Sequence, residues 1–232
     1  MPGILYGVGV GPGDPEYLTL KAIRTMKENQ VIAAPGEDVK ETTAFKIAVQ
    51  AVPEIAEKEL LPVFMPMVMD RNIQRENHKK GAAIIEEVLD QGKNVVFLTL
   101  GDPTVYSTFS YVQEIVEAHG YETRLVSGIT SFCAAAARMN LPLVEWQEPL
   151  HIIPAVHKLD ALPKEPGNYV LMKSGSKMNQ VKAALAESGL EVSMVENCGM
   201  PNEKIYRSLS EIPDDAGYFS LIIAKEKLEN HD

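Results

Sequence analysis

The chain has 232 residues, of which 45% are apolar and 23% carry a charge, a composition typical of folded proteins that excludes a disordered or low-complexity chain. Its length suits two compact α/β units of roughly 100 residues each. The formal net charge of −10 argues against a protein that grips a nucleic-acid backbone, because such proteins usually present a basic surface.

Apolar runs alternate with helical patterns from the start of the chain. Ile4–Val10 is predicted as a strand that ends in glycines. A helix is predicted to begin at Asp14-Pro15-Glu16, because Asp is a favoured N-cap and Pro fits the first turn. The spacing of Leu20, Ile23 and Met26 predicts that these side chains form the inner face of this helix.

The rest of the first half continues the alternation. Predicted strands are Gln30–Ala34, Asn94–Thr99 and Thr123–Val126, and predicted helices cover Thr43–Val52 and Lys80–Leu89. The Asn94–Thr99 run is strongly apolar, as in strands buried on both faces of a parallel sheet. A helix is predicted after Gly101-Asp102-Pro103, closed by Gly120. One side of this helix carries Phe109, Val112, Val116 and His119.

The second half repeats the pattern. Predicted strands are Leu150–Ile153, Tyr169–Lys173, Glu191–Glu196 and Tyr218–Ala224. Two helices are marked by the apolar positions Phe132, Ala135, Ala136 and Met139, and Met178, Val181 and Leu185. The fold class predicted is α/β, with domains 1–127 and 128–232, a parallel first sheet, a mixed second sheet and a ligand cleft between the domains.

A glycine-rich loop follows the first strand, with four glycines and Pro12 between positions 7 and 13. The G-x-G-x-x-G dinucleotide template fails here, because the glycines that it needs are replaced by Pro12 and Asp14. The second strand also lacks the terminal acidic residue that binds ribose, so a nicotinamide oxidoreductase is disfavoured. The glycines still allow a flat ligand to approach the backbone closely, although such a turn needs no ligand.

A second loop, Leu100–Thr108, follows the most apolar strand. Ligands of open α/β sheets bind beyond the carboxyl ends of strands, so its position suggests a binding site. No metal site is predicted, since the five histidines show no ligand spacing and the two cysteines form no metal knuckle. These residues are His78, His119, His151, His157, His231, Cys133 and Cys198.

Together the loops resemble those of the tetrapyrrole methylase family. Its motifs occur in order as Gly9–Pro15, Gly101-Asp102-Pro103 and Gly128–Ser131, although Ser127 stands where many relatives have proline. Four further stretches resemble the branch of the family that methylates C20 of precorrin-2: Phe64–Met67, Thr99–Phe109, Ser131–Arg138 and Tyr218–Leu221. The resemblance implies a C-methyltransferase of cobalamin biosynthesis that uses S-adenosylmethionine (SAM) and converts precorrin-2 or cobalt-factor II to precorrin-3A or cobalt-factor III.

The resemblance also implies site residues. The first domain is expected to face the tetrapyrrole and the second to bind SAM. SAM contacts, largely through the backbone, are implied for Pro12, Leu100, Gly101, Asp102, Val105, Tyr106, Thr130, Ser131, Met172, Asn197, Phe219 and Ser220. Gly11, Arg71 and Arg75 are expected to bind the substrate. The two arginines belong to a basic segment with His78, Lys79 and Lys80. The alternative interpretation is that this segment is a solvated helix face without a binding role.

Three side chains are candidates for catalysis. The Asp102 carboxylate can act as a base or anchor a pyrrole N–H. Alternatively it is only an N-cap, since Asp102-Pro103 repeats Asp14-Pro15. Lys173 and Tyr218 stand at strand ends and can position or deprotonate the substrate; otherwise they are a solvated lysine and a packed tyrosine.

Other functions remain open. A methyltransferase of the same fold can act on another corrin position, on diphthine precursors or on rRNA, and a SAM-binding regulator would have no turnover. The resemblance implies a homodimer. We expect no secretory signal, no membrane span and a cytoplasmic location, because no basic and apolar leader or apolar run of roughly 20 residues is present.

Overall fold

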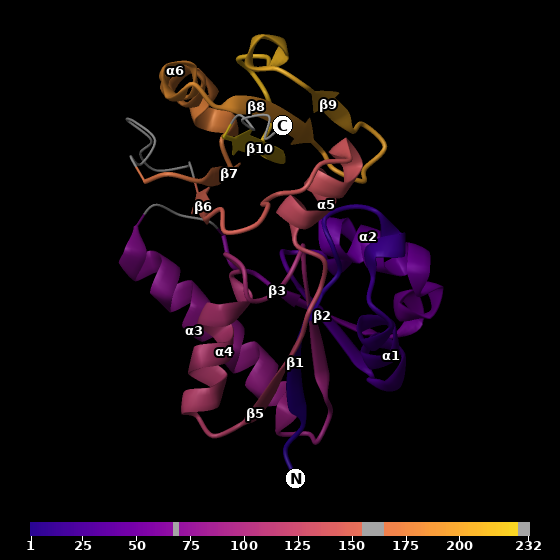
Figure 1. Ribbon diagram of the computed structural model, residues 1–232. Helices are drawn as coiled ribbons and strands as arrows, with labels where there is room; N and C mark the ends of the chain where they lie inside the picture. Colours follow the sequence, from indigo (N-terminus) through magenta and orange to yellow (C-terminus); the bar gives the residue numbers. More distant parts are fainter. Residues whose placement is uncertain (67–69, 155–164, 227–232) are drawn as a thin grey trace. The chain divides into compact units, whose positions relative to one another are not determined.

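Figure 1 shows a computed structural model that describes residues 1–66, 70–154 and 165–226. The chain divides into two compact units, Met1–Thr130 and Ser131–Asp232. Each unit contains one five-stranded sheet. The division lies close to the boundary predicted after residue 127, and the functions predicted for the two domains stay predictions.

The sheet of the first unit is entirely parallel, as predicted. Its strands are β1 (Ile4–Gly9), β2 (Val31–Pro35), β3 (Glu59–Val63), β4 (Val95–Thr99) and β5 (Glu122–Val126), in the order β3-β2-β4-β1-β5. The sequence analysis missed β3, which contains Pro62. Proline cannot donate a ladder hydrogen bond, but β3 is an edge strand and tolerates it.

Four helices cover this sheet (Figure 1). They are α1 (Leu20–Glu28), α2 (Thr43–Ala51), α3 (Arg71–Leu89) and α4 (Phe109–Ala118), and short 3₁₀ turns cover Pro15–Tyr17, Val39–Glu41 and Pro53–Glu57. Side chains of α1 and α2 form one core with the sheet, and those of α3 and α4 form another. The two helix pairs therefore lie on opposite faces.

The helix predicted to begin at Asp14 begins later, at Leu20, and its phase differs from the prediction, since it buries Ala22, Thr25 and Met26. Asp14 caps only the 3₁₀ turn, whereas the hydroxyl of Thr19 accepts a hydrogen bond from the backbone N–H of Ala22 (3.1 Å) and starts α1. Leu20, predicted on the inner face, is 86% exposed. Met26 is fully buried, as predicted.

Two other helix predictions need correction. Helix α3 begins at Arg71, well before the predicted Lys80, because Asp70 caps it and its first turns are polar. The apolar side chains predicted for α4 are buried, but His119 follows the helix, and its exposed ring contacts Glu86 at 2.8 Å. Gly120 adopts a positive φ of 91° beyond the helix end.

The sheet of the second unit is mixed, as predicted. Its strands are β6 (Leu150–Pro154), β7 (Asn168–Met172), β8 (Glu191–Glu196), β9 (Lys204–Tyr206) and β10 (Ser220–Lys225), in the order β6-β7-β10-β8-β9. The pair β6-β7 is parallel and the other pairs are antiparallel. Strand β9 has only three residues and was not predicted.

Two helices complete this unit, α5 (Ser131–Met139) and α6 (Met178–Ser188), with 3₁₀ turns at Gly175–Lys177 and Leu209–Glu211. All seven apolar side chains predicted to mark these two helices are buried. Helix α6 ends at Gly189, which adopts a left-handed conformation with φ of 71°. Among the residues that the structure describes, no helix is long and apolar enough to cross a membrane.

The phase of α1 can be tested by stability. Met26→Ala should lower the free energy of unfolding by about 2–5 kcal/mol, because it empties a buried site. Leu20→Ala should change it by less than about 0.5 kcal/mol, because that side chain is already in water. Urea unfolding followed by circular dichroism measures both. Similar losses for the two variants would restore the phase predicted from the sequence.

Candidate functional site

Three loops of the first unit leave the sheet at adjacent strand ends. Strand β1 lies between β4 and β5 and is parallel to both, so the carboxyl ends of the three strands are neighbours. The motifs predicted at Gly9, Gly101 and Gly128 each begin at one of these ends. The topology therefore brings together three loops that are far apart in the sequence.

The first two loops are joined by backbone hydrogen bonds. Gly11 N donates to Gly101 O (3.2 Å), and Gly101 N donates to Gly11 O (2.8 Å). Both residues have positive φ, 75° and 72°, which glycine adopts without a steric penalty. Val10 N also donates to Thr99 O (3.0 Å), so the link continues from the parallel strands.

Three glycines are in close contact at this point: Gly9, Gly101 and Gly128, here called the glycine junction. A Cβ atom on Gly9 would lie 2.5 Å from Gly101 O and 2.7 Å from Gly128 N. A Cβ atom on Gly128 would lie 2.1 Å from Gly101 O. Neither position accepts a side chain unless the backbone moves.

Asp102 links the second loop to the third. Asp102 is only 7% exposed. Oδ1 accepts hydrogen bonds from the backbone N–H of Thr104 (2.8 Å) and from the Thr104 hydroxyl, and Oδ2 accepts one from Gly128 N (3.0 Å). Both carboxylate oxygens are thus engaged by neighbouring donors.

Asp102 is not the N-cap of the helix that follows it, so the helix-cap interpretation is wrong. Helix α4 begins at Phe109, and the residue at its N-cap is Thr108. Asp102 instead closes a local turn, in which Val105 N donates to Asp102 O (3.2 Å). The role of Asp102 as a base stays a prediction, but its position in the structure is that of a connector between loops.

The other predicted residues of this unit lie on the same loops. Pro12 is buried, Leu100 packs on the core of the α1 face, and Tyr106 is 49% exposed with a positive φ of 47°. Val105, which precedes Tyr106 in the same loop, is half-buried. The Thr130 hydroxyl is buried and has no hydrogen-bond partner in the part of the chain that the structure describes. An unsatisfied buried hydroxyl is costly, so it fits a position that a polar ligand completes.

The basic segment is smaller than predicted. Arg71 and Arg75 lie exposed in the first turns of α3. His78 is buried and stacks on Tyr111 with ring centroids 4.8 Å apart, and its burial lowers the pKa of the imidazole, which favours the neutral form. Lys79 pairs with Glu76 (2.9 Å). The exposed cations near Arg71 are therefore fewer than the sequence suggests.

Residues predicted on the second unit gather at one end of its sheet. Strand β10 runs antiparallel to β7 and β8, so its start lies beside their ends, with Leu221 paired to Met172 and Ser220 to Glu196. Asn197 N donates to Phe219 O (3.1 Å). The structure thus brings Met172, Asn197 and the Phe219-Ser220 pair together, while their contacts with SAM stay a prediction.

The turn before β10 is fixed by Ser220 together with Glu196 and Gly217, two residues that were not predicted as part of the site. Glu196 Oε1 accepts a hydrogen bond from Gly217 N (2.6 Å), and Ser220 Oγ donates to Gly217 O (2.6 Å). A Cβ atom on Gly175 would lie 2.5 Å from the same carbonyl oxygen. No local sequence signal predicts the contacts of Glu196 and Gly175 with Gly217, because they join positions far apart in the chain.

Lys173 and Tyr218 flank the same strand ends. Lys173 follows β7 with a positive φ of 60°, and burial lowers the pKa of its ammonium group. Tyr218 was predicted to open the last strand, but β10 begins two residues later. Burial raises the pKa of its phenol. Its ring packs edge-on against that of Phe219, with ring centroids 5.3 Å apart. Both are candidates to contact a ligand at this end of the sheet.

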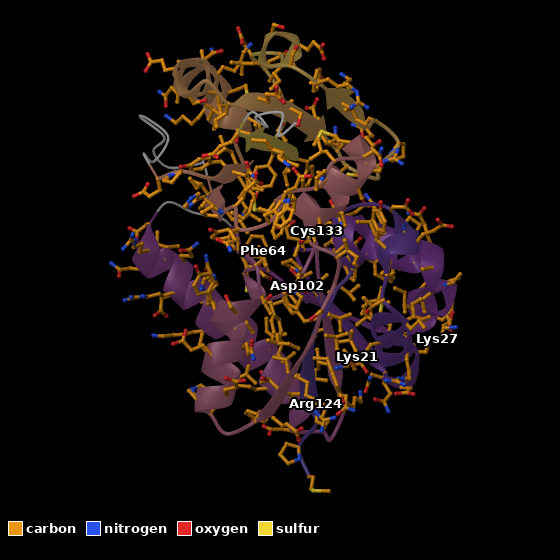
Figure 2. The ribbon with its side chains drawn as sticks, in the orientation of Figure 1. Lys21, Lys27, Phe64, Asp102, Arg124 and Cys133 are labelled. Carbon is orange, nitrogen blue, oxygen red and sulfur yellow. The ribbon has the colours of Figure 1, made fainter. Side chains whose placement is uncertain are left out.

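The described residues contain no group of three or more His, Cys, Asp or Glu that could hold a metal ion. His157, His231 and Met67, which the sequence analysis discussed, lie outside the described residues. Phe64 follows β3 and is 51% exposed. Figure 2 labels Phe64 and Asp102, which belong to different loops of the first unit.

A family model described as Tetrapyrrole (Corrin/Porphyrin) Methylases matches residues 4–213. The chain belongs to the tetrapyrrole methylase family. The resemblance based on the three loops is therefore confirmed, and so is the predicted combination of a parallel and a mixed sheet in the fold of this tetrapyrrole methylase.

Two relatives match nearly the whole chain. A probable cobalt-precorrin-2 C(20)-methyltransferase of Methanocaldococcus jannaschii is 34% identical over 225 residues, which cover 95% of each chain. A cobalt-precorrin-2 C(20)-methyltransferase of Salmonella typhimurium is 30% identical over 238 residues, which cover 99% of each chain.

A solved structure shares the fold. It is a uroporphyrin-III C-methyl transferase of Thermus thermophilus complexed with S-adenyl homocysteine. The match has a TM-score of 0.71 at 22% identity and covers 97% of this chain and 98% of the other.

The connector role of Asp102 makes a prediction about Asp102→Asn. An amide has one acceptor oxygen, so the variant cannot accept from both Thr104 N and Gly128 N. One backbone N–H then faces an amide NH₂, and the free energy of unfolding should fall by about 1–3 kcal/mol. Thermal unfolding measures the loss.

The matched control is Asp14→Asn. Asp14 accepts an exposed hydrogen bond from Glu16 N (2.9 Å), and Asn is about as good a cap as Asp. This variant should unfold at the wild-type temperature. If Asp102→Asn is as stable as Asp14→Asn, Asp102 is not a connector.

Proposed function

We propose that this tetrapyrrole methylase transfers a methyl group from SAM to C20 of precorrin-2 or cobalt-factor II, giving precorrin-3A or cobalt-factor III in cobalamin biosynthesis. The observation that carries the proposal is the match, over 95% and 99% of the chain, to two proteins named for C(20) methylation of cobalt-precorrin-2. SAM is the methyl donor. The likeness to a methyltransferase structure complexed with S-adenyl homocysteine supports this assignment.

The loops suit a methyl transfer whose rate depends on how the donor and the acceptor are aligned. Methyl transfer from a sulfonium is a direct displacement, so alignment of donor and acceptor can supply a large part of the rate. The glycine junction packs the three loops closely against one another, because Gly9 and Gly128 leave no room for a side chain. The loops around it can therefore orient a bound ligand through backbone groups.

The residues proposed to hold SAM are those that the resemblance implies. They are Pro12, Leu100, Gly101, Asp102, Val105, Tyr106, Thr130, Ser131, Met172, Asn197, Phe219 and Ser220. The Thr130 hydroxyl, buried without a partner among the described residues, supports this set, since a ligand acceptor or donor would satisfy it. Gly11, Arg71 and Arg75 are proposed to contact the tetrapyrrole, in a homodimeric enzyme of the cytoplasm.

The reaction itself is tested by product analysis. Incubation with SAM labelled with ¹³C in the methyl group, and with either precorrin-2 or its cobalt form, should give one labelled methyl group on C20 in the NMR spectrum. Label on another ring carbon would assign another ring position, and label on rRNA or on a diphthine precursor would assign one of those functions. Binding of SAM without any transfer would identify a regulator.

Ligand binding separates this function from nicotinamide chemistry. Calorimetry should show one site per chain for S-adenosylhomocysteine and no binding of NAD, because the first loop does not fit the dinucleotide template. Tight binding of NAD without any response to S-adenosylhomocysteine would contradict the proposal.

The exposed arginines of α3 are proposed to attract the carboxylates of the tetrapyrrole. Replacement of Arg71 and Arg75 by Ala should raise the tetrapyrrole KM, while the affinity for SAM stays within about twofold, because exposed charges act mainly on charged partners. Steady-state kinetics with each substrate varied in turn measures both.

A control for this experiment removes two other exposed cations, Lys21 and Arg24, from α1. Figure 2 labels Lys21 on this helix, which packs on the other face of the sheet from α3. The control should keep the wild-type KM. A loss of SAM affinity with an unchanged tetrapyrrole KM in the arginine variant would show that the assignment is wrong.

Lys173 is proposed to take the proton displaced from C20, with Tyr218 placing the substrate. Burial lowers the pKa of the amine, and only the neutral amine accepts a proton, so kcat should rise with pH through that lowered pKa. Lys173→Ala should abolish this rise and lower kcat by about 100-fold, the contribution typical of a general base. Wild-type turnover in a Lys173→Ala, Tyr218→Phe double variant would exclude both roles.

A further inference from the structure

The loop between β8 and β9 carries Asn197, one of the residues proposed to bind SAM. Its backbone is folded on itself, since Met200 N donates to Asn197 O (2.9 Å) and Glu203 N donates to Met200 O (3.0 Å). Asn197 and Gly199 both have positive φ, 53° and 74°. Asn adopts this left-handed conformation more readily than most residues but less freely than glycine, so contacts within the loop help to keep Asn197 there.

Glu203 supplies such a contact. Its Oε2 accepts a hydrogen bond from Gly199 N (2.7 Å), across the loop from its own position. The side chain is only 12% exposed, although it carries a charge. A mostly covered carboxylate that accepts a backbone N–H fixes the loop only while its own orientation is fixed.

Arg138 fixes that orientation. Its Nε donates to Oε1 and Oε2 of Glu203, both at 3.0 Å, and its Nη2 donates to Oε1 at 2.6 Å. The hydrogen bond from Arg138 is the main reason that the pKa of Glu203 lies below its ordinary value. A two-point guanidinium contact also sets direction, which a single ion pair does not.

The same arginine belongs to a helix that begins at another proposed SAM residue. Helix α5 starts at Ser131 and contacts β8 and β10, and its buried side chains include Phe132 and Met139. Arg138 lies in its last turn. The ion pair therefore joins the helix that starts at Ser131 to the loop that starts at Asn197, within one unit.

We propose that Arg138 and Glu203 are positioning residues for the adenosyl ligand: through Gly199 they hold the Asn197 loop in its ligand-binding conformation. Neither side chain needs to touch the ligand. The inference rests on the proposed function, because it takes Asn197 as part of the SAM site. An ion pair that only stabilised the surface would contribute little and would leave ligand affinity unchanged.

Arg138→Ala and Glu203→Gln test the proposal, with calorimetry of S-adenosylhomocysteine as the readout. Each variant should weaken binding about tenfold, as expected when a hydrogen bond to a charged group is lost. The double variant should bind no more weakly than the weaker single variant, because both residues act through one contact. Arg138→Lys should recover only part of the affinity, since an ammonium lacks the two-point geometry.

The matched control is Arg124→Ala, which breaks a comparable ion pair with Glu122 (2.6 Å) on β5. It should keep wild-type affinity. The tetrapyrrole KM of the Arg138 and Glu203 variants should stay within about twofold of wild type, which separates a SAM effect from general damage. Exchange of the Gly199 amide hydrogen should accelerate in Glu203→Gln, a readout independent of ligand binding.

Binding within about twofold of wild type in both single variants would overturn the inference while leaving the proposed function intact. An equal loss in Arg124→Ala, or a Gly199 amide that exchanges as fast in wild type as in the variant, would overturn it as well. Failure of the wild-type chain to bind S-adenosylhomocysteine would instead refute the proposed function, and the inference with it.

Discussion

The hydrogen bond from Gly128 N–H to the carboxylate of Asp102 is the contact on which the candidate site of the first unit depends. It joins the loop after β4 to the segment that follows β5. The two backbone hydrogen bonds between Gly11 and Gly101 join the same loop to the segment that follows β1. Because three strand ends meet there, the carboxylate and these backbone hydrogen bonds together hold the three loops beside one another.

The second unit uses the same device twice. Glu196 accepts a hydrogen bond from Gly217 N, and Glu203 accepts one from Gly199 N. In each case a carboxylate orients the backbone of a glycine beside residues proposed to hold SAM. Gly199 adopts a positive φ of 74°, which glycine permits, and at both glycines the carboxylate restricts the backbone.

The sequence predicted the two sheets and most of the elements, because buried strands and helices carry strong periodic patterns. It missed β3, where Pro62 weakens the pattern, and it placed Leu20 on the wrong face of α1, because Asp14 imitates a helix cap. It also treated Asp102 as a base or a helix cap. Gly128 lies 26 positions from Asp102 in the chain, and no local pattern predicts a contact across that separation.

Hydrogen exchange at the amides of Gly128 and Thr104, resolved by NMR in the wild-type protein and in Asp102→Asn, tests the central contact most directly. The structure predicts slow exchange at both amides in the wild type, and an increase of about 100-fold or more at one of them in the variant, because a lost hydrogen bond opens the site to solvent. Wild-type exchange at the rate of a fully exposed amide at both positions would contradict the account, since Asp102 would then hold neither loop.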